Sequence, residues 1–207
     1  MKLITEHFDQ ELEYLSESRD GKKQHYIEGI FMMSEKENRN GRIYQKPVME
    51  SAVNKYTMEQ VDKGRAVGEL NHPEGPTVNL DKVSHLIESL KWDGNNVIGK
   101  AKILDTPMGS IAASLLNSGV KLGVSTRGMG SLVQREGKNY VGNDFRLAAV
   151  DIVQDPSAHD AFVDSIYEDI EWVFEASSGI WVKKEQIKYR AINEDRALAE
   201  LKNLLFK

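Results

Sequence analysis

Apolar and polar positions alternate over several short stretches of this chain, a period that is typical of half-buried strands. The clearest case is the pair Val83–Trp92 and Asn95–Leu104, which flanks Asp93-Gly94, a dipeptide that favours a tight hairpin turn. Other segments rich in β-branched, aromatic or alternating apolar residues predict four more strands. These are Gln24–Met33, Arg65–Leu70, Lys121–Gln134 and Tyr140–Val153.

Helical spacing is confined to fewer segments. In Pro47–Val61, apolar residues recur four positions apart after a proline that suits the first turn of a helix. Pro107–Ser118 predicts a second helix, closed by Gly119, because glycine readily adopts the left-handed conformation that ends helices. An apolar stripe along Gln186–Phe206 predicts a C-terminal amphipathic helix.

These elements divide the chain into three parts. Residues 1–23 are polar, and Phe8, Leu12 and Leu15 recur at helical spacing, so we expect a short amphipathic helix there. Residues 24–170 hold the predicted strands and should form the main domain. Residues 171–207 form a linker and the C-terminal helix. Antiparallel hairpins interrupted by two or three helices predict an α+β domain with a small barrel-like sheet.

Composition excludes several classes of function. The chain has 207 residues and no cysteine, which excludes disulfides, thiolate metal sites and a cysteine nucleophile. Its net charge of −5 argues against nucleic acid as a partner, because affinity for phosphate backbones comes from clustered Lys and Arg. No apolar run reaches the roughly 18–20 residues that cross a bilayer, and the first 20 residues lack the apolar centre of a signal peptide. We therefore expect a cytoplasmic protein without a membrane partner.

A candidate nucleophile lies in the glycine-rich strand Lys121–Gln134. Ser125 and Arg127 share one face of this strand, because side chains alternate between faces. The glycines at positions 123, 128 and 130 indicate close approach of another backbone, and a peptide substrate would be such a backbone. On this segment alone, an ordinary serine in an edge strand remains an alternative.

Two further residues have the chemistry of a catalytic partner. Asp151 interrupts an apolar run, and a buried carboxylate needs a partner, which can be an imidazole or a structural Arg or Lys. His72 stands between an asparagine and a proline in a loop that could aim its ring, although a surface position without function is also open. His159 is the rival base. Motifs for phosphate loops, HExxH metal sites and the GxSxG elbow are absent from the sequence.

Six blocks of the sequence together resemble the prohead core proteases of T4-like tailed phages. The three that carry the candidate residues are GELNHP, GVSTRGMGSL, and Val150-Asp151 followed by PSA. The others are YIEGIF, NRNGRIY (Asn38–Tyr44) and WDGNNVIGKA. They follow the family's order and extend from Tyr26 to Phe162, which is most of the chain.

The resemblance implies a serine endopeptidase in which Ser125 is the nucleophile, His72 is the general base and Asp151 orients the histidine. The related herpesvirus assemblins have a second histidine at the third position. It also implies an assemblin-like architecture, with 24–170 as the protease domain. Arg127 and the backbone at Gly128 are our candidates for stabilising the oxyanion or binding the substrate.

The family's activity implies substrates and partners. They are scaffold or core proteins and the major capsid protein, cut inside the prohead in the host cytoplasm after Glu in a (Leu/Ile)-X-Glu context. Self-association is expected, and no metal or organic cofactor is required. Triplets of this chain ending at Glu168, Glu194 and Glu200 fit the context and predict autocleavage, whereas the one ending at Glu88 lies in a predicted strand. The alternatives are a non-catalytic core or assembly protein with the same fold, and an esterase using the same Ser and His.

Overall fold

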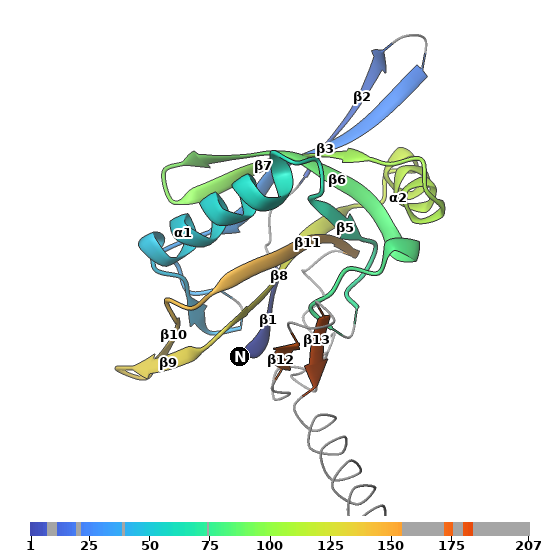
Figure 1. Ribbon diagram of the computed structural model, residues 1–207. Coiled ribbons are helices and arrows are strands. Elements are labelled where there is room, and N and C mark those ends of the chain that lie inside the picture. The colour runs from blue at the N-terminus through green and yellow to red at the C-terminus, as the bar shows by residue number, and fades with distance from the viewer. Residues whose placement is uncertain are drawn as a thin grey trace, which may run out of the picture.

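A computed structural model describes residues 1–7, 12–19, 22–38, 40–73, 75–154, 172–175 and 180–183 of the protein. Over these residues the fold is mixed, mostly strands with two α-helices (Figure 1). The elements in chain order are β1 (Lys2–His7), β2 (Glu13–Arg19), β3 (Lys22–Met33), β4 (Arg42–Ile43), α1 (Lys46–Tyr56), β5 (Val67–Glu69), β6 (Val83–Asp93), β7 (Asn96–Ile103), α2 (Pro107–Asn117), β8 (Leu122–Gly130), β9 (Leu132–Arg135), β10 (Lys138–Val141), β11 (Arg146–Gln154), β12 (Trp172–Glu175) and β13 (Ile180–Lys183).

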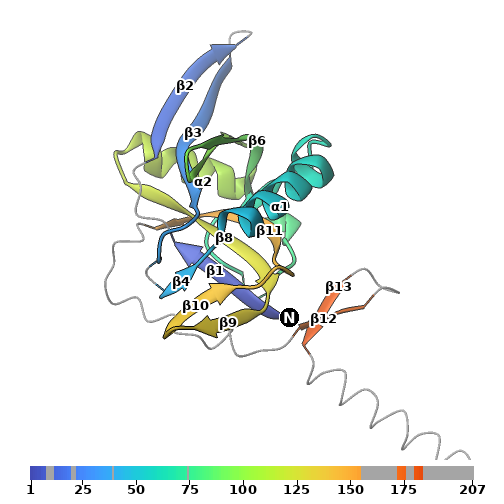
Figure 2. The ribbon, with the colours of Figure 1, turned by 90° about the vertical axis from the view of Figure 1, so that its left-hand side faces the viewer.

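The strands form four sheets. The largest has five antiparallel strands in the order β2-β3-β7-β6-β5, and its β2–β3 end projects away from the rest of the protein (Figure 1). A second sheet has the order β1-β8-β11 and is also antiparallel. The third has the order β4-β10-β9 and the fourth pairs β12 with β13. Figure 2 shows β1 running beside β8, with β9 and β10 at the same end of the molecule.

Most elements that the pattern predicts are present. The hairpin of β6 and β7 closes where Asp93 pairs with Asn96, and Gly94 has a φ of 60°, the left-handed conformation that this turn requires. Helix α1 has a proline in its first turn and continues beyond Tyr56 as a π-helical turn over Thr57–Val61. Helix α2 ends before Gly119 as expected. No helix in the described part of the chain is long and apolar enough to cross a membrane.

Two predictions about secondary structure were wrong. The segment of residues 1–23 contains strands β1 and β2 rather than an amphipathic helix, because β3 and β8 offer it unpaired edges along which an extended chain is hydrogen-bonded. The two long strands predicted over 121–134 and 140–153 each divide into two strands at a bend. The bend is held by the Ser131 carbonyl, which accepts from the Gly142 N–H at 2.8 Å. The predicted helix Gln186–Phe206 lies outside the described residues.

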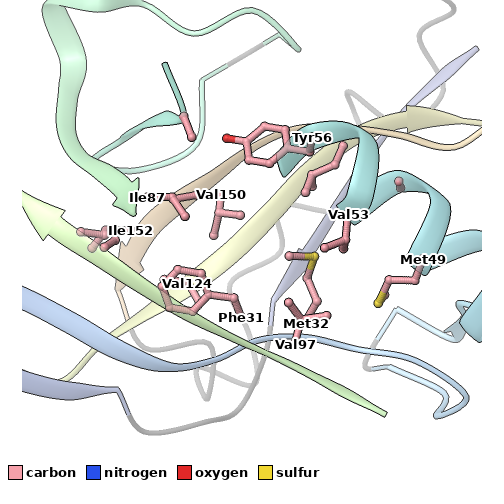
Figure 3. Packing of buried hydrophobic residues seen from close by; sticks show 14 of the residues in the cluster. Phe31, Met32, Met49, Val53, Tyr56, Ile87, Val97, Val124, Val150 and Ile152 are labelled. Atoms are coloured by element: carbon pink, nitrogen blue, oxygen red, sulfur yellow. The ribbon is translucent and has the colours of Figure 1, made fainter. Parts of the chain in front are cut away.

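The apolar core lies between the five-stranded sheet, the β8–β11 pair and α1. In Figure 3, side chains from β3 and β7 lie near those of β8 and β11, with the buried face of α1 beside them. Each such side chain contributes about 1.5–3 kcal/mol on leaving water. The labelled members are Phe31, Met32, Met49, Val53, Tyr56, Ile87, Val97, Val124, Val150 and Ile152.

The edge of the large sheet meets the smaller sheet where β5 approaches β11. Leu70 bridges Ile152 in parallel, and the Asn71 N–H donates to the Ile152 carbonyl at 2.8 Å. A Cβ at Gly68 would lie 2.0 Å from the Val150 carbonyl oxygen, so only glycine allows the two backbones to come this close. This junction fixes the start of the loop that carries His72.

Candidate catalytic site

The register of β8 and β11 brings the first two site residues together. Ser125 pairs directly with Asp151, so their side chains project from the same face of the sheet. Arg127 lies two residues further along β8 and therefore on this face as well. All three residues are fully buried. A polar cluster of this kind inside a sheet must satisfy its charges internally.

His72 joins the pair from the loop after β5. Asn71 has a φ of 68°, a left-handed conformation that asparagine tolerates better than most residues, and it turns the chain towards β11. The Nε2 atom of His72 lies 2.6 Å from Ser125 Oγ, and its Nδ1 lies 3.2 Å from Asp151 Oδ2. Serine, histidine and aspartate thus form one continuous chain of hydrogen bonds, the geometry of an activated nucleophile.

Asp151 accepts hydrogen bonds from Glu69 and Arg127 as well as from His72. Its Oδ1 accepts from the Glu69 N–H at 3.0 Å and from Arg127 Nη2 at 3.2 Å, and its Oδ2 accepts from Arg127 Nε at 2.9 Å. Burial acts to raise the pKa of this carboxyl, but the His72 hydrogen bond, the Arg127 charge and the Glu69 N–H outweigh it and hold the pKa below its ordinary value. Asp151 is therefore ionised and can accept the His72 Nδ1–H.

Arg127, our candidate for an oxyanion or substrate contact, has its guanidinium bound within the protein. Besides Asp151, its guanidinium donates to the carbonyls of Gly75 at 2.6 Å and Thr77 at 3.1 Å, both in the loop that follows His72. Its Nη2 also lies 3.4 Å from Glu69 Oε1. Arg127 thus ties the histidine loop to the buried carboxylates.

Gly128 is enclosed in the sheet. It lies opposite Ile4 of β1 on one side and Leu147 of β11 on the other. A Cβ at this position would be 2.4 Å from the ring of Phe145. The glycine therefore allows the aromatic ring to pack against the strand, as its residue type suggested.

Sequence reasoning missed Glu69, which is fully buried. Its Oε1 accepts the Asn79 N–H at 2.8 Å and lies beside the Arg127 guanidinium, so it supports both the loop and the charge cluster. The signal was present, because Glu69 is an acidic residue inside the apolar segment Val67–Leu70, the same irregularity that drew attention to Asp151.

Strand β1 covers the candidate nucleophile. The Ser125 hydroxyl donates to the carbonyl oxygen of Glu6 at 2.5 Å, and the ladder between the strands pairs His7 with Ser125. Ser125 is consequently inaccessible to solvent, whereas 21% of the His72 side chain remains exposed. The polar N-terminal segment, which we expected to lie apart from the main domain, is part of this site.

The other candidate residues have different positions. His85 is fully buried, with Nε2 donating to the Val150 carbonyl at 2.9 Å and Nδ1 accepting from Ser84 Oγ at 2.8 Å, which is a structural role. His159 and the three predicted autocleavage positions, Glu168, Glu194 and Glu200, lie outside the described residues. Within the described ranges, no group of three histidine, aspartate or glutamate residues is arranged to hold a metal ion.

Comparison with known proteins relates this chain to a family, to a curated protein and to a solved structure. Residues 10–171 match the model of a family described as prohead core protein serine protease. The prohead core protein protease of Enterobacteria phage T4 is 44% identical over 156 residues, which cover 71% of this chain and 74% of the T4 protein. The solved structure of the bacteriophage T4 capsid assembly protease superimposes with a TM-score of 0.70 at 38% identity, covering 75% of this chain and 98% of that one.

Proposed function

Because this chain belongs to the prohead core protein serine protease family, we propose that it hydrolyses peptide bonds with Ser125 as nucleophile, His72 as general base and Asp151 as the orienting carboxylate. The observation that carries this assignment is the hydrogen-bonded chain from Oγ through the imidazole to the carboxylate, at 2.6 Å and 3.2 Å. Family membership makes the protein a protease of phage prohead maturation.

The mechanism follows from which atoms can hold a proton. The ionised Asp151 accepts the Nδ1–H of His72, so Nε2 carries the lone pair that faces Ser125 Oγ. As Oγ attacks a peptide carbonyl carbon, Nε2 takes its proton and later transfers it to the leaving amine. Water then attacks the acyl-enzyme by the same route and releases the new carboxyl terminus.

Arg127 and Glu69 act as positioning residues in this scheme. The guanidinium donates two hydrogen bonds to Asp151 and two more to the loop after His72, so it fixes the position of the carboxylate relative to the imidazole. Glu69 offsets part of the Arg127 charge, and its own N–H binds Asp151. Such a supporting shell fixes the geometry on which turnover depends.

The substrates are scaffold or core proteins and the major capsid protein, cut after glutamate, and the enzyme acts within the prohead together with other copies of itself. This follows the phage proteases that the chain resembles, as does an assemblin-like ancestry of the fold. The positions Glu168, Glu194 and Glu200 remain proposed autocleavage sites, because each ends a triplet of the (Leu/Ile)-X-Glu type.

A peptide substrate fits this site better than a small ester. The strand beside Ser125 is an extended segment along the edge of β8, and an extended peptide is the ligand that such an edge binds through backbone hydrogen bonds. With β1 in place, Ser125 cannot reach an external substrate, so the conformation described here is a latent form.

Replacing the nucleophile tests the proposal. Ser125→Ala should abolish cleavage of a scaffold protein by the incubated full chain, because it removes the hydroxyl that lies 2.6 Å from His72 Nε2. Fragment masses measured over time report the activity. The matched control is Ser51→Ala, which removes an exposed hydroxyl from α1 and should cut at the wild-type rate. Full-rate cleavage by Ser125→Ala would show that the chemistry lies elsewhere.

A further inference from the structure

The side chain of Glu6 fills a polar pocket next to the candidate nucleophile. Glu6 is fully buried although its side chain is acidic, and four donors surround its carboxyl group. Oε1 accepts from Arg42 Nη1 at 3.1 Å and from the Tyr44 hydroxyl at 2.9 Å. Oε2 accepts from the side-chain amides of Asn38 at 2.6 Å and Asn40 at 2.8 Å. Every contact is a donation to the carboxylate, as acidic recognition requires.

One short segment, Asn38–Tyr44, supplies all four donors, and its shape is fixed independently of Glu6. The side-chain oxygen of Asn38 accepts the N–H of Asn40 at 3.0 Å and that of Arg42 at 2.9 Å, which holds the loop in a tight turn. Tyr44 packs edge-on against Phe145, with ring centroids 5.2 Å apart. This segment is the NRNGRIY block of the sequence, for which the proposed mechanism has no use.

The backbone of β1 places a peptide bond at the nucleophile. The carbonyl of Glu6 contacts Ser125 Oγ, and the next residue, His7, is the partner of Ser125 in the ladder. The bond between Glu6 and His7 therefore lies across the nucleophile, with the acidic side chain on its amino-terminal side. Arg42 Nη1 and the Asn40 amide also donate to the Thr5 carbonyl, at 3.3 Å and 3.1 Å. The pocket thus binds the backbone of the strand as well as the side chain.

The residue two positions before Glu6 is also bound. Ile4 lies on the same face of β1 as Glu6, is 1% exposed, and belongs to the apolar cluster that includes Phe145. Thr5, between them, points to the other face and is half-buried. The triplet Ile4-Thr5-Glu6 has the (Leu/Ile)-X-Glu form, and its two specified positions are the two that this face buries.

We propose that Asn38, Asn40, Arg42 and Tyr44 form the pocket that binds the acidic side chain before the scissile bond, and that β1 occupies it as the chain's own substrate. This rests on the proposed function of Ser125 and His72. Asn40, Arg42 and Tyr44 then determine specificity for glutamate, and the first cut of the enzyme falls between Glu6 and His7. Its release would free the edge of β8 for other peptides.

The cleavage uses the same steps as any substrate. The Ser125 hydroxyl first turns its proton from the Glu6 carbonyl oxygen to His72 Nε2. Oγ then bonds to the Glu6 carbonyl carbon while His72 takes that proton, and the C–N bond to His7 breaks as the proton passes to the His7 nitrogen. Water then breaks the ester of residues 1–6 with Ser125. The products are a peptide ending in the Glu6 carboxylate and a chain with a new amino terminus at His7, so the sum is hydrolysis of one peptide bond.

The donors explain selection against close analogues. The NH₂ group of a glutamine would face the donors of the pocket, which would then lack an acceptor. The side chain of aspartate is one methylene shorter and cannot reach all four donors. Burial raises the pKa of the Glu6 carboxyl although Arg42 and the other donors oppose this rise. The group is thus desolvated, and each lost donor carries a large penalty.

The first arm of the test follows the chain itself. Incubated full-length protein should acquire an amino terminus at His7, read by intact mass and N-terminal sequencing. Ser125→Ala should retain its N-terminal residues throughout. Glu6→Gln should slow this cut by about 10- to 100-fold, the range expected when a hydrogen-bonded charge is lost. In each sample a quenched peptide containing Leu-Ala-Glu measures activity on an external substrate.

The second arm tests the pocket with that peptide and a matched peptide containing Leu-Ala-Gln. Arg42→Gln should lower kcat/KM for the Glu peptide by about 10- to 100-fold and lower that for the Gln peptide much less, because the Gln peptide loses only the backbone contact of Arg42. The remaining cleavage of the Gln peptide shows that the variant is folded. Tyr44→Phe keeps the ring against Phe145 and should give a smaller loss in the same direction. Arg65→Gln, an exposed arginine, is the control and should preserve the wild-type ratio.

The outcomes separate the two proposals. If the wild-type chain cuts neither peptide nor itself, the proposed function fails. If it cuts the Glu peptide while its first six residues stay attached, β1 is an inhibitory strand and not a substrate, and this inference is overturned. It is equally overturned if Arg42→Gln and Tyr44→Phe both keep the wild-type preference for the Glu peptide.

Discussion

Three charged residues, Glu69, Arg127 and Asp151, have no exposure to solvent in this protein. Ions buried in this way destabilise a fold unless each finds partners, because desolvation costs several kcal/mol per ion. Here a single guanidinium faces two carboxylates, and backbone groups, the His72 ring and the Asn79 side-chain amide supply further hydrogen bonds. Apolar residues of similar volume at these positions would give a fold that is no less stable. The cluster is therefore better explained by the orientation that it gives to His72.

Asp151→Asn tests that explanation. Asparagine retains the size of the side chain but presents an amide to the Nδ1–H of His72, so we expect turnover to fall by about 10⁴-fold, as in Ser-His-Asp enzymes generally. Arg127 also loses an ionised partner, and we expect the free energy of unfolding to fall by about 3 kcal/mol. Peptide cleavage and denaturant unfolding measure the two effects.

The exposed Asp144 offers a matched control. Its carboxylate accepts from Ser131 at the surface, so Asp144→Asn should leave turnover unchanged and alter stability by less than about 1 kcal/mol. A wild-type rate in Asp151→Asn, accompanied by lower stability, would assign Asp151 a purely structural role as partner of Arg127.

At the scale of elements, the site depends on how β5 and β6 dock on β11. His85 of β6 is fully buried, and its ring lies against Gly68 of β5 while donating to the Val150 carbonyl of β11. The imidazole thus bridges the large sheet and the strand that carries Asp151, one residue from the site. Burial lowers the pKa of His85 from 6.5 to about 4, so the ring is neutral in the folded protein at neutral pH.

This lowered pKa predicts how stability depends on pH. Above pH 6.5 the ring is neutral in both the folded and the unfolded chain, and its contribution is fully present. Between pH 6.5 and about 4 the unfolded chain binds a proton that the folded chain does not, so stability falls as pH falls. The total loss from this group is about 3 kcal/mol. Denaturant unfolding across this range measures it.

A variant without the titrating ring isolates the contribution. His85→Gln should be less stable than the wild type at pH 7 and should show a shallower fall in stability between pH 6.5 and 4. His25→Gln, in which the replaced ring stacks on Tyr14 at the projecting hairpin, should retain the wild-type slope. Equal slopes in His85→Gln and the wild type would place the pH dependence in other groups.

At the scale of the whole molecule, all the proposed cuts would be made at the one candidate site around Ser125. While β1 pairs with β8, no other segment can occupy that edge, so the proposed cut after Glu6 must come first. Since Glu6 and Ser125 already touch within one chain, this cut requires no encounter between molecules. On the proposed mechanism, the form with β1 in place therefore needs no second molecule for its first cut.

Time courses of intact mass should reveal this order. We expect the rate constant for loss of residues 1–6 to be unchanged on tenfold dilution, and cuts after Glu168, Glu194 or Glu200 to appear only afterwards. Loss of C-terminal fragments from chains that retain residues 1–6, or a first cut that slows in proportion to dilution, would contradict the order. Ser125→Ala provides the uncut reference.

The sequence by itself determined the elements whose signals are local. Asp93-Gly94 predicts its hairpin because the turn conformation suits those residues, and the apolar spacing after Pro47 predicts α1 because that face must be buried. The same holds for the irregularities that marked Asp151 and the loop position of His72. Their assignment as a group came from the six blocks that resemble a known family, since nothing local joins residues 72, 125 and 151.

Only the tertiary structure decided which segment pairs with the edge of each strand. The segment of residues 2–7 is too short and too polar for its sequence pattern to predict a strand. It forms β1 because β8 provides unpaired backbone groups, and because Leu3 and Ile4 are buried there. Likewise, Arg127 donates to Asp151 because the register of β8 and β11 sets its neighbours. Pairing between distant segments depends on geometry that a single stretch of sequence does not contain, so the covering strand and the Glu6 pocket emerged only from the fold.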